Sequence, residues 1–318
     1  MNYEARCFIP LFITSGSGPV AESQEPKSGG CETRSFTWGG FMSAIHTARP
    51  RPPLFRALGA ANPPMVVEVD GQHYEQVEIY KHDSWAATAL YAGTAGRITC
   101  KFNRIQPILG FPTLWLGKRL AERERCALER LADLPQIPKP LGPVFVEGQR
   151  LRNAVARVFI PGHPLGKHET VGPKFFSSLR GAILEMHRRG IAYVDLHKRE
   201  NVIVGDDGRP YLVDFQINLD ITHPRLRWLL GIQTVFDWFC EGDLYHLEKH
   251  IRQADPQAAA SRLEIPSWLR IHRTIAVPFR ELRRRLLVAR GIRLGRGSVA
   301  TEVFAEDAVR RESAARAA

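Results

Sequence analysis

The sequence predicts an α+β fold, with a small antiparallel N-terminal part rich in strands and a mainly helical C-terminal part. Strand-like runs fill residues 75–162, whereas helical periodicity dominates after residue 174. No internal repeat interrupts this order. The 318 residues are enough for one two-lobed domain of about 250 residues with extensions at both ends.

The composition changes along the chain and divides it into three parts. Residues 1–62 contain Gly, Ser and Pro punctuation, as in SGSGPV and RPRPPL, without sustained periodicity. Such a segment does not bury enough apolar surface to fold, so we expect disorder or a non-native extension there. We expect the folded domain over 63–265, with a strand-rich lobe to about residue 160, and a basic helical extension and tail over 266–318.

Five runs rich in β-branched and aromatic residues predict the strands of the first lobe. Turn sequences such as GTAG and EGQR separate several of them. The runs are EQVEIY, AATALYA, RITCKF, PVFV and LRNAVARVFIPG. The loop KHDSW, Lys81 to Trp85, joins the first two runs and contains no glycine.

An amphipathic helix follows the third strand and carries an acid on its apolar face. Leu120, Glu124, Leu128 and Leu131 recur at helical spacing. An unpaired carboxylate on such a face is costly, so Glu124 requires a cation. Lys101 in RITCKF is the candidate, with Glu122 and Glu129 as competing acids on the same helix.

A second helix is predicted over Lys174 to Gly190, and the most informative segment of the chain follows it. Its apolar face contains two phenylalanines, a leucine, an isoleucine and a methionine, and Gly190 ends it. The sequence then reads GIAYVDLHKRENVIVGDDGRPYLVDFQ. The runs VIV and YLV around the turn GDDG predict a hairpin, with Asp195 and Asn201 before it and Asp214 at its end.

This segment resembles the catalytic loop HRDLxxxN and the DFG sequence of the protein kinase-like superfamily. The chain is similar to its divergent bacterial branch, which includes lipopolysaccharide-core sugar kinases and bacterial Ser/Thr kinase-like proteins. The resemblance implies a bilobal fold in which Asp195 accepts the proton of the attacking hydroxyl, while Asn201 and Asp214 hold Mg²⁺. It also implies that Lys101 contacts the phosphates of ATP and pairs with Glu124.

The chain departs from the family pattern at several positions. Tyr193 stands where the family has His, Gln216 replaces the Gly of DFG, and Asn201 follows Asp195 by six positions instead of five. Since Lys81–Trp85 lacks glycine, we expect Lys81 or Ser84 to assist the approach to phosphate. Phe159 and Ile160 would line the adenine end. Asp237 or Asp243 would brace the catalytic loop.

These features predict an ATP- and Mg²⁺-dependent kinase that phosphorylates a hydroxyl on a cell-envelope sugar such as the lipopolysaccharide core. No APE-like anchor for a protein substrate follows Asp214. A protein Ser/Thr kinase is the second hypothesis. A nucleotide-binding pseudokinase scaffold is the third, and the missing glycines and the lengthened loop favour it.

Charge and cysteine content indicate the surroundings of the protein. The net charge is +11, and residues 270–296 contain nine arginines against the single acid Glu281. This segment predicts either a solvated face or peripheral contact with an anionic membrane surface, whereas nucleic acid is the least favoured partner. Five cysteines without CxxC spacing indicate a reducing compartment. We therefore expect a cytoplasmic protein, in part on the inner face of the cytoplasmic membrane.

Overall fold

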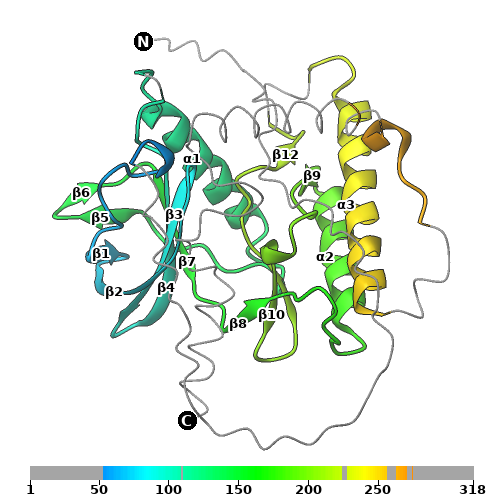
Figure 1. Cartoon of the computed structure of the whole chain (residues 1–318), viewed down its shortest axis with the longest axis horizontal. Coiled ribbons are helices and arrows are strands. Elements are labelled where there is room, and N and C mark those ends of the chain that lie inside the picture. Colours follow the sequence, from blue (N-terminus) through cyan, green and yellow to red (C-terminus); the bar gives the residue numbers. More distant parts are fainter. Residues whose placement is uncertain (1–52, 109, 224–227, 256–262, 271–273, 275–318) are drawn as a thin grey trace, which may run out of the picture.

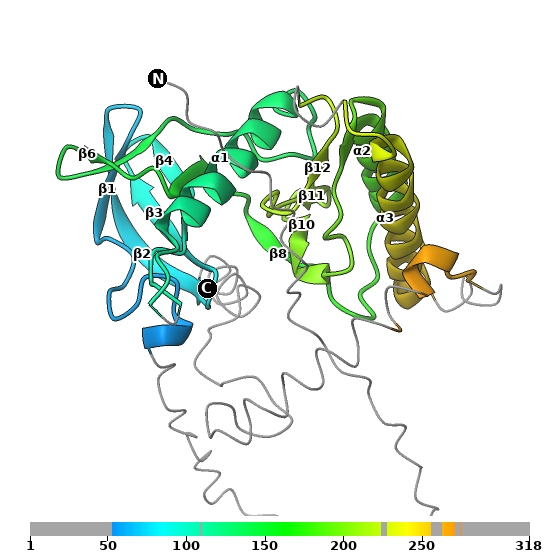
Figure 2. The same cartoon turned by 90° about the horizontal axis from the view of Figure 1, so that it is seen from above.

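The computed structural model of the chain describes residues 53–108, 110–223, 228–255, 263–270 and 274. These residues form the predicted α+β fold, with one seven-stranded antiparallel sheet and a part in which helices dominate. Figure 1 shows the sheet on one side, helices α2 and α3 on the other, and α1 beside the sheet. Seen from above in Figure 2, the curled sheet and the helical pair stand apart, with β8, β10 and β11 between them.

The large sheet contains all five predicted strands. Its order is β6-β5-β1-β2-β3-β4-β7, and every neighbouring pair is antiparallel. The short strands β1 and β6 were not predicted, because four and two residues carry too little alternation to be recognised. The bounds are Val66–Val69 (β1), Gln72–His82 (β2), Ala86–Gly93 (β3), Gly96–Asn103 (β4), Val144–Val146 (β5), Gln149–Arg150 (β6) and Ala154–Val158 (β7).

Three complete helices, a helical stretch at residues 267–270 and two small sheets make up the rest of the described fold. The helices are α1 (Leu114–Arg130), α2 (Phe175–Arg188) and α3 (Ile232–Ala254), and short 3-10 turns cover Pro53–Phe55 and Arg199–Asn201. One small sheet has the order β11-β10-β8, and β12 pairs with β9. These strands are Gly162–Pro164 (β8), Ile191–Ala192 (β9), Val202–Gly205 (β10), Pro210–Leu212 (β11) and Leu219–Asp220 (β12).

The predicted helix and hairpin that position the candidate residues are both present. Gly190 has φ 75°, and its amide bonds the His187 carbonyl, so the backbone leaves α2 through a left-handed residue that glycine adopts easily. In the hairpin, Val202 pairs with Leu212 and Val204 with Pro210. A third strand, β8, pairs with β10 on the other side and was not predicted as a member of this sheet.

Two apolar clusters form the core of the described part. One lies within the large sheet and includes Tyr91, Cys100 and Phe102. The other joins α1 and β7 to α2, the hairpin and α3, and contains residues such as Leu128, Val155, Ile183, Leu212 and Leu247. The sheet side and the helical side therefore share one core. Between Val158, the end of β7, and Gly162, the start of β8, the chain passes from the large sheet to the small one.

The predicted outer boundaries lie partly outside the described residues. Residues 53–62 were assigned to the extension, yet Ala57 is fully buried and its amide bonds the Asp83 carbonyl. The packed part of the chain therefore includes residues before 63. Residues 1–52, and all of the basic segment 270–296 except 270 and 274, lie outside the described part. Among the described residues, no helix has the length and apolar character required to cross a bilayer.

Candidate functional site

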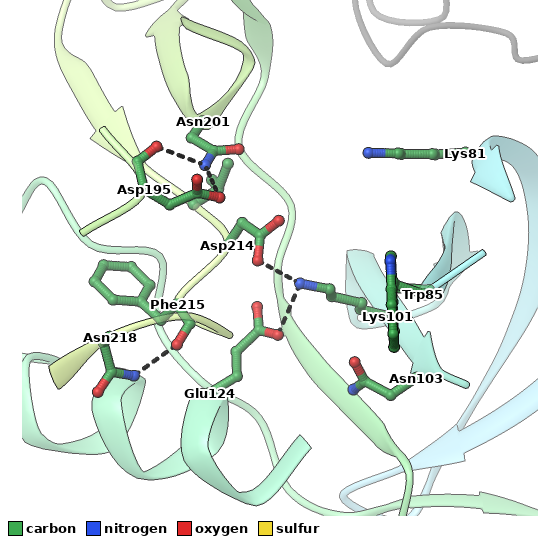
Figure 3. A network of polar contacts seen from close by, with 12 residues as sticks. Lys81, Trp85, Lys101, Asn103, Glu124, Asp195, Asn201, Asp214, Phe215 and Asn218 are labelled. Carbon is green, nitrogen blue, oxygen red and sulfur yellow. Dashed lines mark hydrogen bonds and ion pairs between the residues drawn. The ribbon is translucent and has the colours of Figure 1, made fainter. Parts of the chain in front are cut away.

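Lys101, Glu124 and Asp214 meet although they come from three distant parts of the chain. The Lys101 Nζ lies 2.6 Å from Asp214 Oδ1 and 3.0 Å from Glu124 Oε2 (Figure 3). Lys101 projects from β4, Glu124 from the inner face of α1, and Asp214 follows β11. The structure thus brings Lys101 to the acid predicted for it, while Glu122 pairs with Arg125 on the surface of the helix.

The charges of this cluster stabilise one another. Burial alone would lower the pKa of the Lys101 ammonium, but the carboxylates of Asp214 and Glu124 raise it above its usual value. Burial raises the pKa of Glu124 more than Lys101 lowers it. Burial would also raise the pKa of Asp214, yet the cations Lys101 and Lys198 hold that pKa well below its usual range. The Asp214 side chain, 31% exposed, therefore remains a carboxylate that a ligand can reach.

Two further contacts tie α1 to the segment that follows Asp214. The Arg123 guanidinium donates a hydrogen bond to the Asn218 carbonyl. Arg130 pairs with Asp220 and also donates to the Arg189 carbonyl at 2.9 Å. Because both arginines lie on the helix that carries Glu124, these contacts help to hold Glu124 at Lys101.

Asp195 and Asn201 also lie together, despite the longer spacing between them. The Asn201 Nδ2 donates to the Asp195 carbonyl at 3.2 Å and to the Asp195 Oδ2 at 3.1 Å. Asp195 is 2% exposed, and burial, aided by the nearby Asp214, raises its pKa against the lowering effect of Lys198. In Figure 3 both residues face the side on which Asp214 lies. The 3-10 turn Arg199–Asn201 brings Asn201 back to Asp195.

Lys198 is a site residue that the sequence reasoning missed. Its Nζ donates to Asp195 Oδ2 at 2.9 Å, and the His197 Nδ1 lies 3.2 Å from Asp195 Oδ1. From the sequence, this loop was notable only for the six-position spacing between Asp195 and Asn201. The sequence did contain a signal for this contact: Lys198 follows Asp195 by three positions in a short loop, and a side chain at that spacing can reach back to the carboxylate.

Asp243, and not Asp237, braces the loop before Asp195. Its Oδ2 accepts the Tyr193 amide and its Oδ1 accepts the Val194 amide, both at 2.8 Å, while His187 Nε2 lies 3.0 Å from Oδ2. Val194 has φ 72°, a left-handed conformation that costs free energy for a β-branched residue. Two charge-assisted hydrogen bonds at this point hold the strained backbone that directs Asp195. Asp237 instead accepts a hydrogen bond from Gln233 on the surface of α3.

Tyr193 connects the two chain segments that carry the acids. Its hydroxyl donates to the Val213 carbonyl, next to Asp214, and its ring packs edge-on against Phe215 with centroids 5.1 Å apart. Asp214 itself has φ 66°. Gln216 is 9% exposed and therefore part of the packed interior. Tyr193 thus links the backbone segment before Asp195 to the segment that carries Asp214.

The glycine-free loop between β2 and β3 is closed by polar side chains. Asp83 Oδ1 accepts the amides of Trp85 and Ala86 at 2.7 and 2.9 Å, and its other oxygen lies 2.9 Å from Lys81 Nζ. Arg104, 2% exposed, donates to the Ser84 carbonyl at 2.5 Å and also to the carbonyls of Leu54 and Pro107. These contacts fix the shape of the glycine-free loop. Asp83 and Arg104 were not predicted as site residues.

The other residues predicted to contact ATP lie in different surroundings. Lys81 Nζ extends toward the side of Asp214 and Asn201 in Figure 3. The Ser84 hydroxyl is committed to the Phe55 carbonyl at 3.0 Å. Phe159 is buried at the crossing between β7 and β8, and Ile160 follows it there. The assignment of these residues to ATP stays a prediction.

The oxygen donors at the site suit a hard divalent cation. Asp214 uses Oδ1 for Lys101, which leaves Oδ2 for another partner. The Asn201 amide nitrogen is engaged by Asp195, so its oxygen points away from Asp195, as Figure 3 shows. Carboxylate and amide oxygens of this kind bind Mg²⁺ together with water and phosphate oxygens. The residues present therefore fit the predicted metal.

No protein-family model matches the chain, and no curated protein matches it. The case for a function therefore depends on the geometry and chemistry of the side chains described above.

Proposed function

We propose that the protein is a Mg²⁺-dependent phosphotransferase with a divergent protein kinase-like fold. In this proposal the large sheet with α1 corresponds to the small lobe, and the part from β8 onward corresponds to the helical lobe. The donor is a nucleoside triphosphate, for which the sequence resemblance indicates ATP. The acceptor is a hydroxyl group.

The observation that carries the proposal is the convergence of five polar side chains from four segments. Lys101, Glu124 and Asp214 form one charged cluster, and Asn201 and Asp195 form a hydrogen-bonded pair beside it. A purely structural role does not account for Asp214, which keeps a strained φ of 66° and an accessible carboxylate. Clustered groups with shifted pKa values in such a setting are typical of functional sites.

Each side chain has a definite task in phosphoryl transfer. Lys101 would bind phosphate oxygens by its ammonium group, and Glu124 keeps that group in place. Asp214 and Asn201 would hold Mg²⁺, which when bound neutralises charge on the phosphates. Asp195 would accept the proton of the acceptor hydroxyl as the new O–P bond forms and the bond to the leaving nucleoside diphosphate breaks. Lys198, bonded to the same carboxylate, would bind the transferred group electrostatically.

For the acceptor we propose a hydroxyl on a cell-envelope sugar such as the lipopolysaccharide core. The segment after Asp214 supports a non-protein acceptor, because it turns at once into β12, which pairs with β9, and Arg130 binds Asp220 there. It therefore offers little extended edge to a peptide. A protein serine or threonine is the second acceptor to test.

The experiment measures transfer of labelled γ-phosphate with Mg²⁺ to fractionated envelope glycans and to cell protein. We compare the wild type with Asp195→Ala and Asp214→Ala, and use Asp237→Ala as the control, since that acid lies on the surface of α3. Both site substitutions should reduce transfer at least about 100-fold, on the magnitude of general-base catalysis, whereas the control should match the wild type.

The outcomes separate the alternatives. Label in glycan that both site substitutions abolish supports the sugar acceptor, and label in protein supports the protein kinase. If the folded wild type labels no fraction above the variants, the phosphotransferase proposal is wrong. Binding of Mg²⁺-nucleotide without any transfer would then favour the scaffold.

A further inference from the structure

Arg157 presents a cation on the face of the sheet that carries Lys101. In the β4–β7 ladder, Val155 is opposite Lys101 and Arg157 is opposite Thr99. Residues opposite one another, and residues two apart on one strand, lie on the same face of a sheet. The intervening Ala156 and Cys100 pack into the core on the other face. Arg157 therefore lies on the Lys101 face, one step further along β7.

The Arg157 guanidinium has no hydrogen bond or ion pair with any other described residue. Burial lowers its pKa more than the carboxylates of Glu124 and Asp214 raise it, and neither carboxylate lies within ion-pair distance. Arg157 is half-buried, and a guanidinium in that position without a protein acceptor has exchanged part of its hydration for no hydrogen bond within the described protein. An acceptor from a bound ligand would correct this.

The position along the strand indicates which part of a ligand reaches Arg157. Two residues of β-strand separate it from the level of Lys101, a distance of about 7 Å. Along β7 the direction from Val155 to Arg157 leads toward the crossing at Phe159, before β8. If phosphates lie at Lys101, as the proposed function requires, the base of the nucleotide extends toward Arg157.

The chemistry of the guanidinium selects among bases. It has five N–H donors in a planar fork and no acceptor. The O6 and N7 atoms of guanine are two adjacent acceptors that match this fork, whereas adenine places an amino donor beside N7. We propose that Arg157 binds the O6/N7 edge of a purine and makes GTP the preferred phosphate donor. This inference rests on the proposed phosphotransferase function and refines the donor expected from the resemblance.

The test measures dissociation constants of the full chain for the Mg²⁺ complexes of GTP, ITP, ATP and inorganic tripolyphosphate by thermal-shift titration. The wild type should bind GTP and ITP at least about tenfold more tightly than ATP, since one bidentate pair discriminates by that amount. Arg157→Met should remove the preference. Arg157→Gln should reverse it toward ATP, because an amide can donate to N7 and accept from the adenine amino group.

Arg150→Met is the matched control, since Arg150 is exposed on the edge strand β6. It should keep the wild-type preference. Equal wild-type affinity for GTP and ATP would overturn the inference and leave the phosphotransferase proposal standing. So would an equal loss of GTP and tripolyphosphate binding in Arg157→Met, because the arginine would then bind phosphate. Failure of the wild type to bind any Mg²⁺-nucleotide would overturn both. Even if a variant does not fold, the ratio of the wild-type dissociation constants for ATP and GTP tests the inference.

Discussion

Asp195 combines strong burial with a cation on one carboxylate oxygen, and this combination determines how it titrates. Burial raises its pKa, and Lys198 at 2.9 Å acts in the opposite direction. A catalytic base works only when deprotonated, so transfer should be lost as the pH falls through this raised pKa. The acid limb of the pH profile should therefore lie at higher pH than for an ordinary aspartate.

Removing the Lys198 cation tests this assignment. Lys198→Met should move the acid limb of kcat to still higher pH, because the effect that lowers the pKa of Asp195 is lost, whereas Lys198→Arg should leave the limb near its wild-type position. The measurement is kcat for phosphate transfer across the pH range. An acid limb that stays in place in Lys198→Met would show that Asp195 is not the group that titrates.

Helix α1 connects the site to the helical part through charges at its C-terminal half. Arg130 binds both Asp220 and the Arg189 carbonyl. Among the described acids, Arg125 forms ion pairs with Glu122 and Glu129 alone, and both belong to its own helix. Contacts between distant segments contribute more to the position of a helix than pairs within it. Substituting each arginine in turn therefore compares a contact between segments with a contact within α1.

Arg130→Met should lower the free energy of unfolding by about 1 kcal/mol and reduce kcat, because Glu124 becomes less well positioned for Lys101. Arg125→Met should change the unfolding free energy by about 0.5 kcal/mol or less and leave kcat unchanged. Urea unfolding and the transfer assay provide both quantities. Equal effects of the two substitutions would mean that the contact with Asp220 does not hold the helix.

The whole described molecule is expected to unfold as one unit, because one apolar cluster includes residues of the sheet side and the helical side. Leu128 on α1 is 1% exposed in this cluster. Leu128→Ala should lower the free energy of unfolding by about 2–5 kcal/mol through the lost contacts and the cavity left behind.

The exposed Leu184 on α2, 46% accessible, is the control, and Leu184→Ala should change stability by about 0.5 kcal/mol or less. Far-ultraviolet circular dichroism and tryptophan fluorescence should report the same single transition, because the described part has Trp85 on the sheet side and Trp238 on α3. Two separated transitions in the wild type would contradict a common core.

Much of the fold was predictable because local spacing carries it. The alternation in RITCKF and the helical spacing around Glu124 and Met186 led to β4, α1 and α2, and the turn GDDG led to the β10–β11 hairpin. The strands β1, β6, β8, β9 and β12 were missed, since such short segments become strands only through their neighbours.

The sequence by itself determined the class of fold, the order of its elements and the candidate acids, because residue type and periodicity act over a few positions. Only the tertiary structure decided between Asp243 and Asp237, brought Lys198 to Asp195, and placed Arg157 on the Lys101 face. These contacts span loops and different elements. They depend on which surfaces pack together, and that packing is a property of the whole chain.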